Sequence, residues 1–156
     1  MTGKGAELVG VCCRRKIDIL CVQETRWGGS KARELGLGYK LIYHGESTKR
    51  NGVGVIVSEN IKSNVIEVKR VSDRLMIVRL AFGKAVVNVV SAYAPQMGCT
   101  DDEKEKFWES LENKLQSIPS EERIIMGADL NGRVGRSRNN YERVHGGYGY
   151  GECNEE

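Results

Sequence analysis

Two nearly continuous apolar runs in this chain each lead into acidic and amide residues. Residues 17–22 (Ile-Asp-Ile-Leu-Cys-Val) are followed by Glu24, and residues 123–126 (Arg-Ile-Ile-Met) are followed by Asp129 and Asn131. Such runs are typical of buried strands, and layered α/β sheets bind ligands beyond the carboxyl ends of their strands. The pattern therefore predicts that the three polar residues meet at one rim of the fold.

The periodicity of other segments predicts two helices. Residues 5–16 place Leu8, Val11 and Cys12 on one helical face. A second helix is expected to begin at Thr100, which precedes a glutamate by three positions, the spacing of a capping box. Its apolar residues share one face and predict packing on a sheet through Phe107, Trp108, Leu111, Leu115 and Ile118.

Alternating and β-branched segments predict a series of strands between the helices. Residues 27–38 are rich in glycine and charge and are expected to form a loop, and residues 44–52 a turn. The step Gly83-Lys84 between two apolar segments predicts a hairpin within an antiparallel meander. The expected strands are residues 39–43, 52–58, 64–70, 74–82 and 85–93.

Composition excludes several classes of protein. A chain of 156 residues with 40% hydrophobic and 29% charged residues suits one globular domain. No segment approaches the ~20 apolar residues of a membrane span, and no secretory leader is evident, so we expect an intracellular protein without a membrane partner, a location compatible with the nucleus. The chain has five cysteines but no C-x-x-C pair, and its two histidines are His44 in a predicted turn and His145 in a glycine-rich segment. This set of residues disfavours a zinc site.

A cluster of basic residues follows the second apolar run. Between residues 132 and 144 the chain has four arginines and one acidic residue. Arg133, Arg136 and Arg138 are candidates for binding a phosphate backbone beside a metal site. A solvated loop with incidental arginines is an equally acceptable interpretation, and the sequence leaves the two open.

The residue types at the predicted rim suit a divalent metal ion. Magnesium prefers oxygen ligands and retains several waters, so one or two carboxylates and the phosphate oxygens of a substrate are sufficient. Glu24 is the candidate ligand for Mg²⁺ or Mn²⁺, Asp129 can orient or deprotonate a water, and Asn131 can donate to a phosphate. Tyr93, at a strand end, can place a phenol near the same phosphate, although such tyrosines are usually structural. No small-molecule cofactor is predicted.

Four segments in order resemble the endonuclease/exonuclease/phosphatase superfamily. The closest resemblance is to the endonuclease domain of RTE-type non-LTR retrotransposons and to host proteins of the craniofacial development protein 2-like group. It implies a single α/β domain over residues 1–156 with a four-layer sandwich, in which two mixed sheets face each other and helices lie outside. It also implies magnesium-dependent cleavage of DNA phosphodiesters. The matching segments are residues 17–25, 51–58, 91–95 and 127–132.

The resemblance also implies roles for individual residues. Glu24 matches the metal ligand, Tyr93 the phenol near the phosphate, Asp129 the residue that orients water, and Asn131 its partner. The family opens with a strand bearing an asparagine and closes with strands bearing an aspartate and a Ser-Asp-His motif, which this chain does not match. We therefore expect a domain without its first and last strands, with activity severely impaired or lost, and with an uncovered sheet edge through which copies associate.

Three functions follow as hypotheses. The first is a retrotransposon-derived, metal-dependent endonuclease acting on DNA. The second is a non-catalytic remnant that binds nucleic acid or protein. The third, less favoured because no specificity loop is recognisable, is a phosphomonoesterase of the same superfamily.

Overall fold

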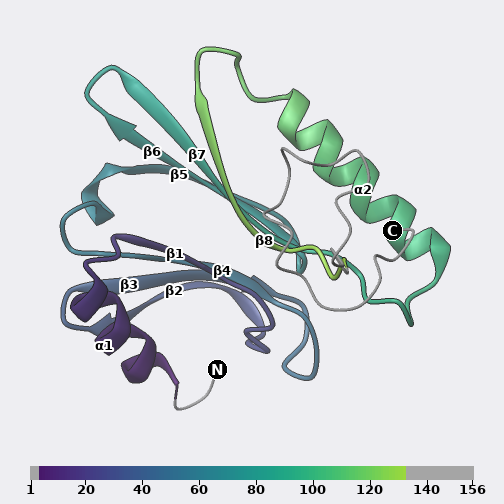
Figure 1. Ribbon diagram of the computed structural model, residues 1–156, viewed down its shortest axis with the longest axis horizontal. Helices are drawn as coiled ribbons and strands as arrows, with labels where there is room; N and C mark the ends of the chain where they lie inside the picture. The colour runs from purple at the N-terminus through teal and green to yellow at the C-terminus, as the bar shows by residue number, and fades with distance from the viewer. Residues whose placement is uncertain (1–3, 133–156) are drawn as a thin grey trace, which may run out of the picture.

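Two four-stranded sheets lie face to face in the computed structural model, which describes residues 4–132 (Figure 1). The predicted hairpin at Gly83-Lys84 is present, since Phe82 and Ala85 close an antiparallel pair of strands. In chain order the elements are α1 (Gly5–Arg15), β1 (Ile19–Val22), β2 (Gly29–Gly36), β3 (Tyr39–Gly45), β4 (Val53–Val57), the 3₁₀ turn η1 (Lys62–Asn64), β5 (Val65–Ser72), β6 (Leu75–Phe82), β7 (Ala85–Tyr93), α2 (Asp101–Gln116) and β8 (Arg123–Asp129).

The two sheets differ in strand direction. The first has the order β1-β4-β3-β2 and is antiparallel throughout. The second has the order β5-β6-β7-β8, in which the antiparallel meander is followed by a parallel pair of β7 and β8. A parallel pair needs a crossover connection, and α2 supplies it. The carboxyl ends of β7 and β8 therefore lie at the same edge of the second sheet.

Apolar side chains form three packed layers. α1 covers the outer face of the first sheet through Val9 and Cys12, and α2 covers the outer face of the second through Phe107 and Leu111 (Figure 1). The inner faces pack together through side chains that include Val55, Val78 and Val89. The order helix, sheet, sheet, helix confirms the predicted four-layer α/β sandwich. Among the described residues no helix is long and apolar enough to cross a membrane.

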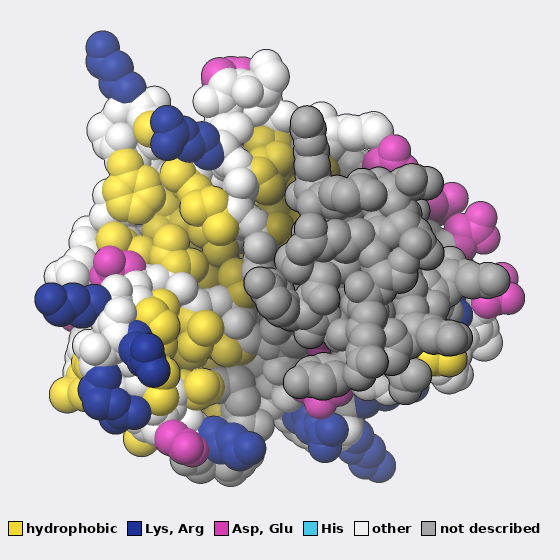
Figure 2. Space-filling model, viewed as in Figure 1, with side chains coloured by type: hydrophobic (Ala, Val, Ile, Leu, Met, Phe, Trp, Pro, Cys, Tyr) yellow, Lys and Arg dark blue, Asp and Glu magenta, His cyan; other side chains and the backbone are white. Residues whose placement is uncertain are grey.

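The outer strands β1 and β8 approach each other closely because of a glycine. A Cβ atom at Gly127 would lie 2.6 Å from the Cβ of Cys21 and 2.7 Å from its Sγ, so only glycine fits there. An open groove between these two edges is lined partly by Ile19, Val89 and Ile125. Figure 2 shows hydrophobic side chains gathered on one face of the molecule.

Several predictions about exposure and boundaries are wrong. Residues 29–36 form the outer strand β2 instead of a loop. The side chains of β2 are mostly exposed, so the sequence has no apolar alternation there, and the strand is held by main-chain pairing with β3. His44 lies in β3 and not in a turn. Val9 is buried in α1 whereas Val11 is exposed, and Trp108 of α2 is also exposed.

The apolar run of β8 forms a strand that is not buried among the described residues. Ile124, Ile125 and Met126 are 39–53% exposed, because β8 is the outer strand of its sheet and pairs on one side with β7. An apolar run identifies a strand but does not specify what covers it. The expected association of copies through such an edge finds no support in the structure and stays a prediction.

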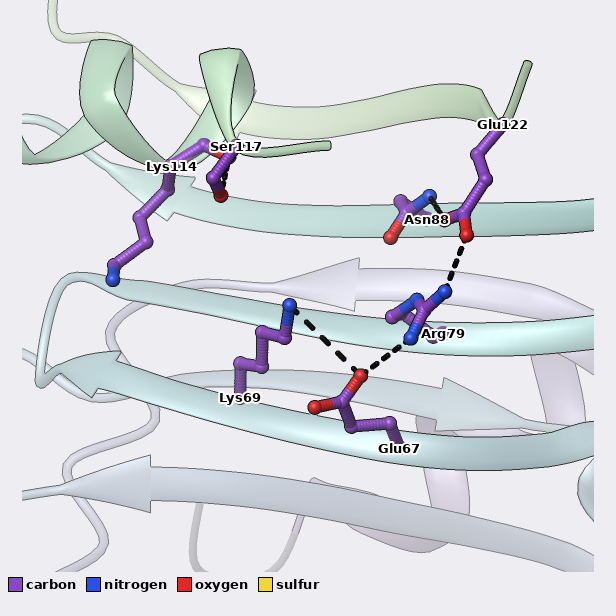
Figure 3. Close-up of polar contacts among 7 residues, drawn as sticks. All are labelled: Glu67, Lys69, Arg79, Asn88, Lys114, Ser117 and Glu122. Atoms are coloured by element: carbon purple, nitrogen blue, oxygen red, sulfur yellow. Dashed lines mark hydrogen bonds and ion pairs between the residues drawn. The ribbon is translucent and has the colours of Figure 1, made fainter. Parts of the chain in front are cut away.

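A charged cluster lies beside the start of β8 (Figure 3), at the opposite end of that strand from Asp129. Arg79 on β6 pairs with Glu67 at 2.7 Å and with Glu122, which directly precedes β8. Asn88 on β7 donates a hydrogen bond to Glu122 at 2.7 Å. The cluster therefore joins the four strands of the second sheet at this end.

The charged cluster predicts a pH dependence of stability. The hydrogen bond from Asn88, followed by the Arg79 pair, lowers the pKa of Glu122 below its ordinary value of 4.5. A carboxyl whose pKa is lower in the folded state stabilises the fold above that ordinary value, and the contribution disappears as pH falls through the lowered pKa. We expect Glu122→Gln to flatten the loss of thermal stability below about pH 4.5, measured by circular dichroism. Glu121→Gln, at the exposed neighbour, is the control, and equal acid slopes in both variants would contradict the prediction.

Candidate active site

Glu24 lies two residues beyond the end of β1 in an unusual backbone conformation. Its φ is +50° and that of Arg26 is +53°, both in the left-handed region that non-glycine residues rarely adopt. The amides of Thr25 and Arg26 donate to the carbonyls of Gly52 and Asn51, each at 3.0 Å. The loop before β4 therefore holds the backbone on the carboxyl side of Glu24.

The Glu24 carboxylate meets residues from the opposite sheet. Tyr93, at the end of β7 and only 3% exposed, donates its hydroxyl to Glu24 Oε1. Gln96 Nε2 lies 2.9 Å from the Tyr93 hydroxyl and 3.5 Å from Glu24 Oε1. Arg26 Nη2 lies 3.4 Å from the other carboxylate oxygen. The two sheets thus contribute to one polar cluster at the rim.

The ionisation of this pair follows from its surroundings. The hydrogen bond from Tyr93 lowers the pKa of Glu24, and Arg26 acts in the same direction. Burial, followed by the bond to Glu24, raises the pKa of Tyr93 above its ordinary value. Near neutral pH, Glu24 is therefore an anion and Tyr93 a neutral hydrogen-bond donor.

Asp129 and Asn131 lie beside Tyr93 on the neighbouring strand. Asp129 is opposite Tyr93 in the parallel pairing of β7 and β8, and its carbonyl accepts from the amide of Ala94 at 2.9 Å. Asn131 donates its backbone amide to Asp129 Oδ1 at 3.0 Å and its side-chain amide to the carbonyl of Ala94 at 2.7 Å. The structure thus gathers Glu24, Tyr93, Asp129 and Asn131 at one rim, while their catalytic roles stay predictions.

Other candidate residues have a different outcome. Arg133, Arg136 and Arg138 lie outside the described residues, as does His145, so their roles stay untested. His44 contacts Ser30 Oγ through Nδ1 at 2.8 Å, in the pairing of β2 and β3.

Two glutamines of the site were not predicted from the sequence. Gln96 binds both Tyr93 and Glu24, and its position just after Ala94-Pro95 was the available signal. Gln23 donates to the carbonyl of Gly127 at 3.0 Å and so joins β1 to β8.

The donor set suits an open site for a magnesium-type ion better than a closed site made of protein ligands alone. Among residues 4–132, no group of three or more His, Cys, Asp or Glu side chains is placed to hold a metal ion. A magnesium site needs only one or two carboxylates, with water and substrate oxygens completing the shell. The Glu24 side chain is 42% exposed and ionised at neutral pH, so it fits as the protein ligand of such an open site.

Comparison with known protein families settles the kinship of the chain. The model of the Endonuclease/Exonuclease/phosphatase family matches residues 6–148. This chain belongs to that family. The family predicted from four sequence segments is therefore confirmed, and members of the endonuclease/exonuclease/phosphatase family generally depend on divalent metal ions.

Relatives extend the comparison to longer proteins. Craniofacial development protein 2 of Bos taurus is 30% identical over 144 residues, which cover 91% of this chain and 24% of that protein. The chain thus spans about a quarter of that curated relative. The endonuclease domain of TRAS1, a telomere-specific non-LTR retrotransposon, has a TM-score of 0.60 at 19% identity over 81% of this chain and 52% of its own.

A second solved structure shows the same fold. TDP2 of D. rerio, complexed with a single-strand DNA product, has a TM-score of 0.58 at 13% identity, over 89% of this chain and 56% of its own. At these identities the two solved structures establish the fold alone, which agrees with the predicted sandwich.

Proposed function

We propose that this chain carries a divalent-metal phosphodiesterase site that acts on DNA. The observation that carries the proposal is the contact of Glu24 with Tyr93 across the two sheets, beside Asp129 and Asn131. An ionised carboxylate, a neutral phenol, a second acid and an amide supply the ligand, donors and base that phosphodiester hydrolysis requires.

Each residue has a proposed role. Glu24 holds Mg²⁺ or Mn²⁺, which when bound neutralises charge on the phosphate. Asp129 orients and deprotonates the attacking water, and Asn131 fixes Asp129 through the bond to its carboxylate. Tyr93, whose single hydroxyl proton is donated to Glu24 in this structure, would turn that donor toward a phosphate oxygen once Glu24 holds a metal ion, and Gln96 holds its phenol in place.

DNA is the proposed substrate because of two solved structures with the same fold. One is the endonuclease domain of a retrotransposon, and another is complexed with a single-strand DNA product. Arg133, Arg136 and Arg138 are proposed to bind the phosphate backbone next to the site. An intracellular, nuclear place of action stays a prediction.

Nicking of supercoiled plasmid tests the proposal. With protein in excess of DNA we expect Mg²⁺- or Mn²⁺-dependent conversion to the open circle, and none with EDTA, because the reaction needs the ion at Glu24. The rate decides between this proposal and the expectation from the sequence that activity is severely impaired or lost. Absence of nicking by protein that circular dichroism shows to be folded would contradict the proposal.

Two further measurements separate the other hypotheses. A non-catalytic remnant would bind DNA without cleaving it, with an affinity that falls steeply as salt rises. A phosphomonoesterase would hydrolyse p-nitrophenyl phosphate while leaving plasmid intact. Either result would replace the endonuclease proposal.

A further inference from the structure

Asp73 lies in the turn between β5 and β6 and contacts the first sheet. Its Oδ2 accepts a hydrogen bond from Asn51 Nδ2 at 2.8 Å. Its carbonyl accepts from the amide of Gly52 at 2.9 Å. These bonds join the second sheet to the loop that precedes β4.

The same loop holds the backbone beside the candidate metal ligand. The carbonyls of Asn51 and Gly52 accept from the amides of Arg26 and Thr25. Glu24, Arg26 and Asn51 have φ values of +50°, +53° and +57°. Non-glycine residues persist in this region only where surrounding contacts fix them. Asp73 therefore anchors the loop that holds Glu24 in its conformation.

Arg74, the next residue, contacts the other half of the site. Its Nη1 donates to the carbonyls of Tyr93 and Ala94 at 3.3 and 3.2 Å. Its guanidinium lies 5.1 Å from the centre of the Tyr93 ring, a cation–π distance. The carbonyl of Ala94 also accepts from Asn131 Nδ2 at 2.7 Å. Arg74 and Asn131 thus share one acceptor.

We propose that the Asp73–Arg74 turn is a positioning element that sets Glu24 relative to Tyr93 and Asn131. Asp73 fixes the segment from the first sheet, and Arg74 fixes the segment from the second. The two residues are adjacent, so a single short turn aligns the candidate ligand Glu24 with Asn131, which lies about a hundred positions further along the chain. This inference rests on the proposed function, because alignment matters only where a metal ion and a phosphate meet.

Amide hydrogen exchange, followed by NMR on the full chain without metal, tests the role of Asp73 and the role of Arg74 separately. We expect Asp73→Ala to accelerate exchange at Thr25 and Arg26 about tenfold, the loss expected for one hydrogen bond to a charged group, with Ala94 unchanged. Arg74→Met should have the opposite pattern, with faster exchange at Ala94 only. If either variant accelerates exchange both at Thr25 and Arg26 and at Ala94, the assignment of separate roles to Asp73 and Arg74 is overturned.

Asp18→Ala provides a matched control. It removes a 2.5 Å hydrogen bond from Ser58 at the opposite end of the first sheet. It should change exchange at Thr25 and Arg26 less than twofold. If it accelerates these amides as much as Asp73→Ala does, the effect is general destabilisation and the proposal fails.

Binding of Mn²⁺, measured by calorimetry, distinguishes this inference from the proposed function. Asp73→Ala should weaken Mn²⁺ binding about tenfold, and Asp73→Asn, whose amide oxygen still accepts from Asn51, should restore it. If Glu24→Gln leaves Mn²⁺ binding intact, the proposed function fails while hydrogen exchange still decides the positioning role. If Glu24→Gln abolishes binding but Asp73→Ala changes neither binding nor exchange, the positioning inference fails alone.

Discussion

We expect Glu24→Gln to lower the proposed metal-dependent nicking of DNA about a thousandfold, because a bound metal ion supplies several kcal/mol of transition-state stabilisation. The substitution keeps the size of the side chain and an oxygen that can accept from Tyr93. It removes the negative charge that we propose holds a divalent ion. The rate should fall to that of wild-type protein in EDTA, measured on supercoiled plasmid at saturating Mn²⁺.

The control for Glu24→Gln is a similar acid far from the rim. Glu59 follows β4 at the opposite end of the first sheet and pairs with Lys62. Glu59→Gln should nick at the wild-type rate. Unchanged metal dependence in Glu24→Gln would show that the ion binds elsewhere, and the assignment of the ligand would have to be abandoned.

The sequence was sufficient to predict that the candidate residues at strand ends lie at one rim, while their roles stay predictions. Glu24 and Asp129 follow apolar runs, and the rule that ligands collect beyond strand ends placed them together. Tyr93 and Asp129 lie opposite each other because α2 makes β7 and β8 parallel. These features depend on the local sequence pattern and on the topology, and the order of the elements along the chain indicates both.

What the sequence did not predict depends on turns and on neighbours. The contacts of Asp73 with Asn51 and of Gln96 with Glu24 arise only once the two sheets face each other, and Arg74 reaches the carbonyls of Tyr93 and Ala94 only once β6 and β7 pair. β2 has mostly exposed side chains, so no apolar alternation marks it. In α1, Val9 and Val11 are both apolar, and a helical period alone does not decide which one faces the sheet.

We expect Asp129→Asn to lower the nicking rate by about 10² to 10⁴, the range for loss of a positioned general base. An asparagine keeps an oxygen that can accept from the Asn131 amide, so the turn after β8 should persist. The change removes the ability to take a proton from water. Because proton transfer occurs during the chemical step, kcat should fall with little change in KM or in Mn²⁺ affinity. Single-turnover rates on a plasmid measure the loss in the chemical step.

Combining the variants tests whether the rim works as one unit. If Glu24 and Asp129 act on the same transition state, the double variant should nick scarcely more slowly than Glu24→Gln alone, because residues that act together are strongly non-additive. Leu130→Ala, at the exposed neighbour of Asp129, should keep the wild-type rate. Fully multiplicative losses would instead mean that the two carboxylates, although the fold brings both to one rim, act in separate steps.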